Sequence, residues 1–243
     1  MQLLGFLGVA ALALASLAVG ARLVALGLRT RRSPELWIGL SYLFAGFLSC
    51  VATLALGELR RSGSELAGGA ELAASATLHT GVACLAVFVW CVFRRGSRVG
   101  TAAVCAAVGY VTLTFIGVAF EGTESAGGTL SGWASLAGRI GVYAWAASES
   151  FLEYGAARRR VRVGLADPLV ANRLLLWGIG TGCVLLLWLH SGLTLLRGQG
   201  GGTSSYPLIA LLGISCAATS WLAFFPPAFY RRRFAAPGGA AAV

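Results

Sequence analysis

Two glutamates, Glu149 and Glu153, lie four residues apart in an otherwise apolar stretch, and a helix places both carboxylates on one face. Arg173 enters the next apolar stretch from the same side, so we expect it at a similar depth. One interpretation is a structural ion pair between Glu149 or Glu153 and Arg173. The other is a proton or cation site, or a charge switch that a ligand displaces. The spacing alone leaves both interpretations open.

The turn between these two stretches contains Asp167–Pro168, a pair that is typical of a helix start. The aspartate caps the first free N–H groups, and proline is tolerated at the first helical position. Asn172 lies one turn further on, where it could bond to a neighbouring helix. The candidate binding residues are therefore Tyr143, Glu149, Glu153, Asn172 and Arg173.

The only histidines of the chain, His79 and His190, fall near the ends of two different apolar stretches. Two histidines at similar depth could ligate a haem or share a metal ion. No further ligand at a convincing spacing completes such a site, so we predict no metal and no cofactor. The histidines and the two glutamates also fall at opposite ends of the predicted helices, which leaves no acid–base pair. We therefore predict a protein that is not an enzyme.

The composition indicates where these residues are held. Hydrophobic residues make up 57% of the chain, charged residues 12%, and the mean hydropathy is +0.78, which is too apolar for a soluble domain. The net charge of +10 comes from 19 basic residues, all of them arginine. These arginines follow the ends of apolar runs, so they indicate contact with anionic lipid headgroups rather than with nucleic acid. The absence of lysine excludes a retinal Schiff base.

Seven stretches are long enough to cross a membrane as helices. The predicted spans are about 3–28, 35–56, 71–93, 99–120, 133–154, 169–196 and 206–230. The sequence thus predicts an all-α bundle of seven transmembrane helices in one domain, residues 1–234, with a disordered cytoplasmic tail at 235–243. Fifteen arginines fall on one side of these spans and 4 on the other. This bias predicts that the amino terminus is outside and the carboxyl terminus is in the cytoplasm.

The segment from Arg162 to Gly178, RVGLADPLVANRLLLWG, resembles a segment of bacterial seven-helix membrane proteins of unassigned function. In that group an arginine-rich loop, an LADP turn and an NRxLLW helix start occur together. The matching residues here are Leu165, Ala166, Asp167, Pro168, Asn172, Arg173, Leu175, Leu176 and Trp177. The resemblance implies a multi-pass protein of the bacterial inner (plasma) membrane, and it implies no reaction and no ligand.

Three functions are consistent with this sequence. The first is a sensing or adaptor protein, whose pocket would lie among the third, fifth, sixth and seventh spans and whose basic cytoplasmic face would meet a partner. The second is a small-solute or proton-coupled transporter that uses Glu149 and Glu153. The third is a structural subunit of a larger membrane complex. The expected partners are the lipid bilayer, with its anionic inner-leaflet lipids, and a membrane or cytoplasmic protein, but no nucleic acid.

Overall fold

A computed structural model of the chain describes residues 2–121, 129–198 and 206–234, and every regular element in these ranges is helical. The predicted tail at 235–243 lies outside the described residues. The helices, with the π-helix labelled η1, are α1 (Gln2–Thr30), α2 (Ser33–Ser41), η1 (Tyr42–Leu48), α3 (Ser49–Arg61), α4 (Ala67–Phe93), α5 (Arg98–Glu121), α6 (Leu130–Arg162), α7 (Pro168–Leu196), α8 (Tyr206–Phe224) and α9 (Ala228–Phe234).

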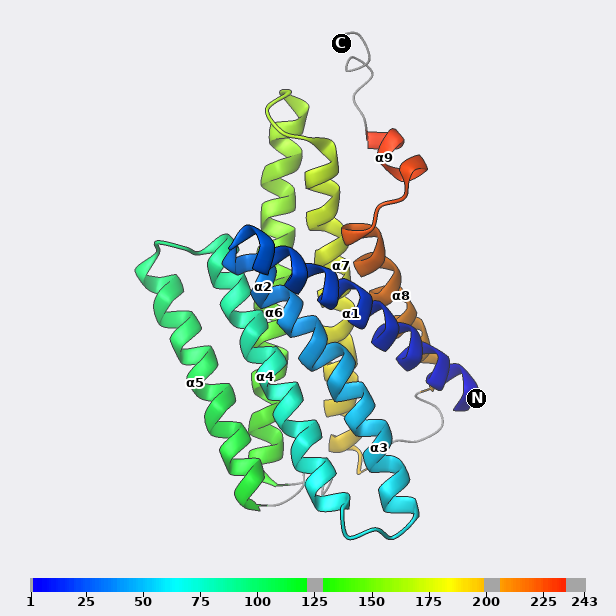
Figure 1. Cartoon of the computed structure of the whole chain (residues 1–243). Helices are drawn as coiled ribbons and strands as arrows, with labels where there is room; N and C mark the ends of the chain where they lie inside the picture. The colour runs from blue at the N-terminus through cyan, green and yellow to red at the C-terminus, as the bar shows by residue number, and fades with distance from the viewer. Residues whose placement is uncertain (1, 122–128, 199–205, 235–243) are drawn as a thin grey trace.

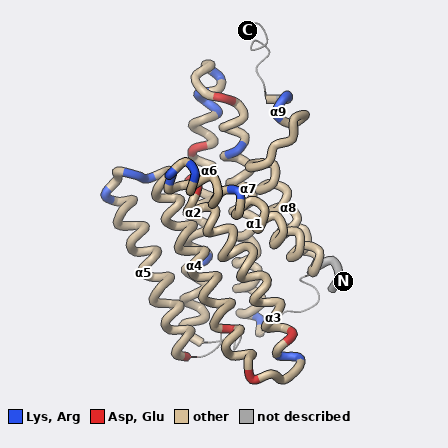
Figure 2. Tube along the Cα trace, viewed as in Figure 1, with Lys and Arg blue, Asp and Glu red and all other residues tan. Residues whose placement is uncertain are grey.

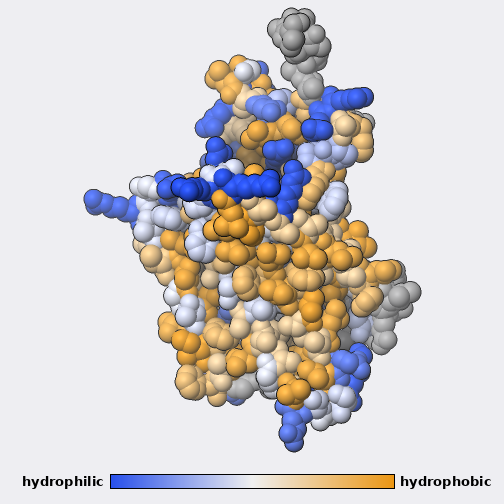
Figure 3. Space-filling view, viewed as in Figure 1, coloured by the Kyte–Doolittle hydropathy of each residue, from blue (hydrophilic) through white to orange (hydrophobic). Residues whose placement is uncertain are grey.

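The described residues contain six helices that are long and apolar enough to cross a membrane: α1, the continuous α2–η1–α3 helix, α4, α5, α7 and α8. Figure 3 shows apolar side chains over the middle of the visible face, with hydrophilic residues towards its two ends. The chain is therefore a multi-pass membrane protein by the length and composition of its helices. The helix predicted as the fifth span, α6, is not among the six, because small and polar residues such as Arg139 lower its hydropathy.

The helices form one bundle in which α4, α5, α6 and α7 run side by side (Figure 1). The first helix, α1, crosses the bundle obliquely and packs against α8 and α2. Glycine makes the α1–α8 crossing close, since a Cβ atom on Gly8 would lie 2.5 Å from the Cα atom of Ala210. Small residues commonly mediate such close approaches between membrane helices.

The second span differs from its predicted form in two ways. It contains the π-helical turn of η1, and it continues to Arg61 instead of ending near residue 56. The extension has a physical reason, because Arg60 bonds Glu71 of α4 through Nη2 and Oε2 at 2.7 Å, which joins the ends of two neighbouring helices. Single π-helical turns within helices frequently lie at functional sites.

Two other predicted spans have different ends. The fifth, predicted at 133–154, runs from Leu130 to Arg162, because the arginine-rich segment continues the helix. The seventh, predicted at 206–230, is two helices: α8 ends at Phe224, and the short α9 begins at Ala228. Pro226 and Pro227 separate them, since proline has no N–H to donate and clashes with the preceding turn.

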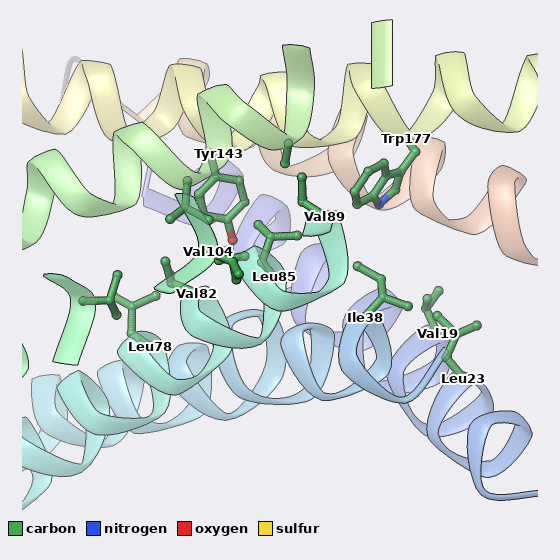
Figure 4. Packing of buried hydrophobic residues seen from close by; sticks show 14 residues of the cluster. Val19, Leu23, Ile38, Leu78, Val82, Leu85, Val89, Val104, Tyr143 and Trp177 are labelled. Carbon is green, nitrogen blue, oxygen red and sulfur yellow. The ribbon is translucent and has the colours of Figure 1, made fainter. Parts of the chain in front are cut away.

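The hydrophobic core lies where α1, α2, α4, α5, α6 and α7 meet. Val82, Val89 and Ala146 are fully buried there. Figure 4 shows Tyr143 and Trp177 on facing sides of this cluster, with Leu85 and Val89 between them. The core therefore brings two aromatic side chains from α6 and α7 against the same face of α4.

Candidate functional site: a cavity inside the bundle

The turn before α7 has the form that the sequence predicts. Asp167 caps the helix by accepting a hydrogen bond from the backbone N–H of Leu169 at 2.8 Å, and Pro168 occupies the first turn. Asn172 donates through Nδ2 to the hydroxyl of Tyr230 at 2.7 Å. This bond ties α7 to α9, so Asn172 has a structural contact at the arginine-rich end of the bundle.

The ion pair predicted between the glutamates and Arg173 is corrected by the structure. Arg94, directly after α4, donates through Nε to Oε1 of Glu149 at 2.7 Å, and Trp145 donates to the same oxygen at 3.1 Å. The Glu149 side chain is only 8% exposed, whereas that of Arg94 is 48% exposed. The hydrogen bond that Arg94 donates to Glu149 is the main reason that the pKa of Arg94 is raised above its ordinary value. The guanidinium therefore stays charged at any physiological pH.

The other two charged candidates take no part in that bond. Arg173 is exposed on α7, and no ion pair joins it to Glu149 or Glu153 among the described residues. Glu153 is half-buried one turn beyond Glu149, where its charge also favours the charged form of Arg94 and so raises the pKa of that arginine. The spacing included Glu149, the carboxylate that forms the ion pair, but it could not identify the arginine, because Arg94 lies 55 residues away.

We expect Arg94→Gln to lower the thermal midpoint of the purified protein in lipid nanodiscs, because the buried carboxylate of Glu149 loses its charged partner. Arg173→Gln removes a charge at the same end of the bundle and is the matched control, with little expected effect. Circular dichroism or a thermal-shift assay measures both midpoints. Equal midpoints for the two variants would contradict the Arg94–Glu149 assignment.

A cavity of about 480 Å³ opens inside the bundle on the side of α4 away from α5. Its walls come from α1, the α2–η1–α3 helix, α4, α6, α7 and α8. Most of the lining is apolar, and the polar members include the hydroxyls of Tyr42, Tyr143 and Thr181. Apolar pockets with a few polar groups are the usual form of a small-molecule site.

The cavity extends to the surface of the bundle between α3 and α7. Leu54 of α3 lines it and is 49% exposed, and Ser191 of α7 lines it and is also exposed. In this region α3 packs on α4 rather than on α7. The opening is therefore bordered by two helices that are apolar enough to cross a membrane, so it would face lipid.

The cavity is only partly the pocket that the sequence predicts. Tyr143 lines it, but Glu149, Glu153, Asn172 and Arg173 do not. The pocket was expected among the third, fifth, sixth and seventh spans; the cavity also uses the first and second, including Ala45 and Gly46 of η1. The π-helical turn gives no composition signal, so this wall was not predictable.

Beside the cavity, α4 and α6 share a group of buried polar residues that the sequence analysis did not bring together. His79 bonds the carbonyl of Ser75 through Nδ1 at 2.8 Å and the hydroxyl of Ser135 through Nε2 at 2.8 Å. Arg139 donates to that same hydroxyl at 2.6 Å, and its guanidinium lies 4.8 Å from the ring centre of Trp188. Trp188 lines the cavity, so the polar group contacts the cavity wall.

Helical spacing could have found this group. Glu71, Ser75 and His79 follow one another at four-residue intervals, as do Ser135 and Arg139, and all five are buried. Both ring nitrogens of His79 are engaged by serines, and the described residues contain no group of three potential metal ligands. His190 lies on α7 at the cavity, and its Nε2 has no hydrogen-bond partner in the described part of the chain.

The fold and the cavity define the class of the protein: a helical multi-pass membrane protein with an internal, largely apolar cavity. Comparisons with protein families, with characterised proteins and with solved structures give no match to the chain.

Proposed function

We propose that this protein is a membrane sensor or adaptor that binds a small apolar ligand from the bilayer in the cavity between α1, η1, α3, α4, α6, α7 and α8. The observation that carries the proposal is the cavity itself, about 480 Å³ of mostly apolar space that reaches the surface between α3 and α7. A lipid-facing opening suits a ligand that dissolves in the membrane.

The proposal includes α6 as a seventh span. Its buried residues recur at intervals of three and four, and they include the polar Ser135, Arg139, Glu149 and Ser150. A membrane helix with polar residues is stable when those residues face the protein interior. The contacts of α6 with α4, α5 and α7 place this polar stripe inside the bundle, which explains why hydropathy alone does not mark α6 as a span.

The arginine-rich end of the bundle is the proposed cytoplasmic side. Figure 2 shows basic residues gathered at the end where α6 and α7 extend beyond their neighbours. This distribution supports an outside amino terminus and a cytoplasmic carboxyl terminus. The exposed arginines at the end of α6, Arg158, Arg159 and Arg160, would contact anionic lipid headgroups or an acidic surface of a protein partner.

A chain of aromatic contacts supports coupling between the cavity and the arginine-rich end of the bundle. Trp177 lines the cavity, and its ring centre lies 4.8 Å from that of Phe88 and 6.0 Å from that of Phe93. Phe93 immediately precedes Arg94, which bonds Glu149. A ligand that displaces Trp177 would therefore act on the end of α4 and on its bond to α6.

Two adjacent leucines of α7 provide the test. Leu187 lines the cavity, whereas Leu186 does not and is 52% exposed. In nanodiscs with diphenylmethane as the apolar probe, we expect a raised thermal midpoint for the wild type and for Leu186→Trp. Leu187→Trp places a larger side chain in the cavity and should abolish the rise. Binding at 100-fold above Kd would stabilise the folded protein by about 2.7 kcal/mol.

Sensing requires a second readout at the arginine-rich end. Trypsin cleaves after arginine, and Arg94, Arg95 and Arg98 lie in or beside the short turn between α4 and α5. The probe should change the cleavage rate of this turn in the wild type and in Leu186→Trp but not in Leu187→Trp. A midpoint shift that is the same in all three proteins would reject the cavity as the site, and binding without any change in cleavage would reject the sensing role.

A further inference from the structure

Two nitrogen atoms in the wall of the cavity carry unused hydrogen-bonding capacity. Nε1 of Trp188 and Nε2 of His190 are both buried from water, and neither has a hydrogen-bond partner among the described residues. Both side chains belong to α7 and line the cavity. Buried polar groups are nearly always bonded, and leaving one unsatisfied costs about 1–3 kcal/mol. Two such atoms on one wall are therefore an unusual feature.

Three other polar side chains of the lining bond within the chain. The hydroxyls of Tyr42 and Ser220 are 2.9 Å apart, Thr181 donates to the carbonyl of Trp177 at 3.0 Å, and Ser191 donates to that of Leu187 at 2.9 Å. These groups are already satisfied by the protein. Among the described residues of the lining, Trp188 and His190 are the ones with a buried side-chain nitrogen that lacks a hydrogen-bond partner.

The indole of Trp188 is contacted by a charged side chain of α6. The guanidinium of Arg139 lies 4.8 Å from its ring centre, and Arg139 is itself fixed by its bond to Ser135. An indole N–H can only donate, so its partner must be an acceptor. The imidazole nitrogen of His190 can serve as donor or acceptor according to its tautomer. A hydrogen-bond acceptor on the ligand can therefore bond both Nε1 of Trp188 and the protonated Nε2 of His190.

We propose that the ligand of the cavity is an apolar molecule with a carbonyl oxygen, which accepts a hydrogen bond from Nε1 of Trp188 while its hydrocarbon part fills the space towards Tyr143 and η1. His190 bonds the same polar group of the ligand. This inference rests on the proposed function, because it names the ligand class of the same cavity.

A matched pair of probes tests it. Benzophenone and diphenylmethane have the same two rings, joined by a carbonyl in the first and by a methylene in the second. One neutral hydrogen bond contributes about 0.5–1.5 kcal/mol, so we expect benzophenone to bind the wild type about 2-fold to 10-fold more tightly than diphenylmethane does. Midpoint titrations in nanodiscs measure both affinities at equal lipid concentration.

Trp188→Phe removes the N–H and keeps an aromatic ring for Arg139, so this variant should lose most of the preference for benzophenone and keep only the part that His190 contributes. Trp221→Phe is the control, because Trp221 lies on α8 outside the cavity lining and is 46% exposed. It should keep the preference for benzophenone. Full retention of that preference by Trp188→Phe would overturn the inference.

The result for diphenylmethane separates this inference from the proposed function. If the wild type binds both probes equally and Leu187→Trp blocks both, the cavity is a ligand site without carbonyl recognition, and only the inference fails. If Leu187→Trp changes the binding of neither probe, the cavity is not the site, and the proposed function fails with it.

Discussion

Gly81→Ala is expected to destabilise the folded protein by about 1–3 kcal/mol, the usual cost of adding a methyl group to a well-packed interface. A Cβ atom on Gly81 of α4 would collide with the backbone nitrogen and the Cβ of Ala45 in η1, and its distance to the Cα atom of Ala45 would be 2.8 Å. Backbone cannot rotate away as a side chain can. The substitution must therefore move η1, which forms one wall of the cavity.

Gly109→Ala is the matched control for this experiment. Gly109 lies in α5, and a Cβ atom there would meet nothing within 4 Å. Alanine is favoured over glycine inside a helix by about 0.5–1 kcal/mol, so this variant should be neutral or slightly more stable. Thermal midpoints in nanodiscs measure both variants. Equal midpoints for Gly81→Ala and Gly109→Ala would show that α4 and η1 do not pack as closely as described.

Arg139→Met should also have a large effect. The arginine is only 8% exposed, donates to Ser135 and stacks on Trp188, so methionine fills the space but loses the charged hydrogen bond. Hydrogen bonds to charged groups contribute about 1.5–3 kcal/mol, which sets the expected loss of stability. Because Trp188 loses its stacking partner, the preference for benzophenone over diphenylmethane should weaken as well.

Arg197→Met is the control. Arg197 is the exposed C-cap of α7, so this substitution removes the same charge from a surface position. It should change neither the midpoint nor the probe preference. An equal, small effect of both substitutions would mean that the buried group around His79 and Ser135 does not stabilise the bundle.

The sequence predicted the helical membrane class and the capped start of α7, because both depend on local patterns. Long apolar runs predict helices, and Asp167–Pro168 predicts a helix start from residue types alone. The stretch predicted as the fifth span, residues 133–154, is helical as part of α6, but its polar residues keep α6 outside the six helices that are apolar enough to cross a membrane. Its place in the bundle depends on which neighbours cover those residues.

The ion pair and the cavity lining depend on tertiary contacts, which a local sequence pattern does not predict. Tyr143 was predicted as a binding residue and lines the cavity, but the partner of Glu149 is Arg94 rather than Arg173. Both arginines lie at the same end of the bundle, so charge and predicted depth could not distinguish them. The cavity wall at η1 depends on a local change of helical winding, which these residue types do not encode in an obvious way.

The buried polar group was closer to being predictable. Its members repeat at helical spacing on α4 and again on α6, which indicates two polar faces that must be covered. His79 bonds Ser75 and Ser135, which share this helical spacing, and not His190, the other histidine of the chain. The spacing within each helix was therefore more informative than the pairing of like residues.

Photolabelling is the most direct test of the central claim that the cavity is a ligand site. Irradiated benzophenone inserts into nearby C–H bonds, and mass spectrometry of the digested protein identifies the labelled peptides. We expect labels on η1 and α3 and on α7 between Trp177 and Ser191, with loss of both in Leu187→Trp and retention in Leu186→Trp. Labels on α5, which contributes nothing to the cavity lining, or labelling that Leu187→Trp leaves unchanged, would contradict it.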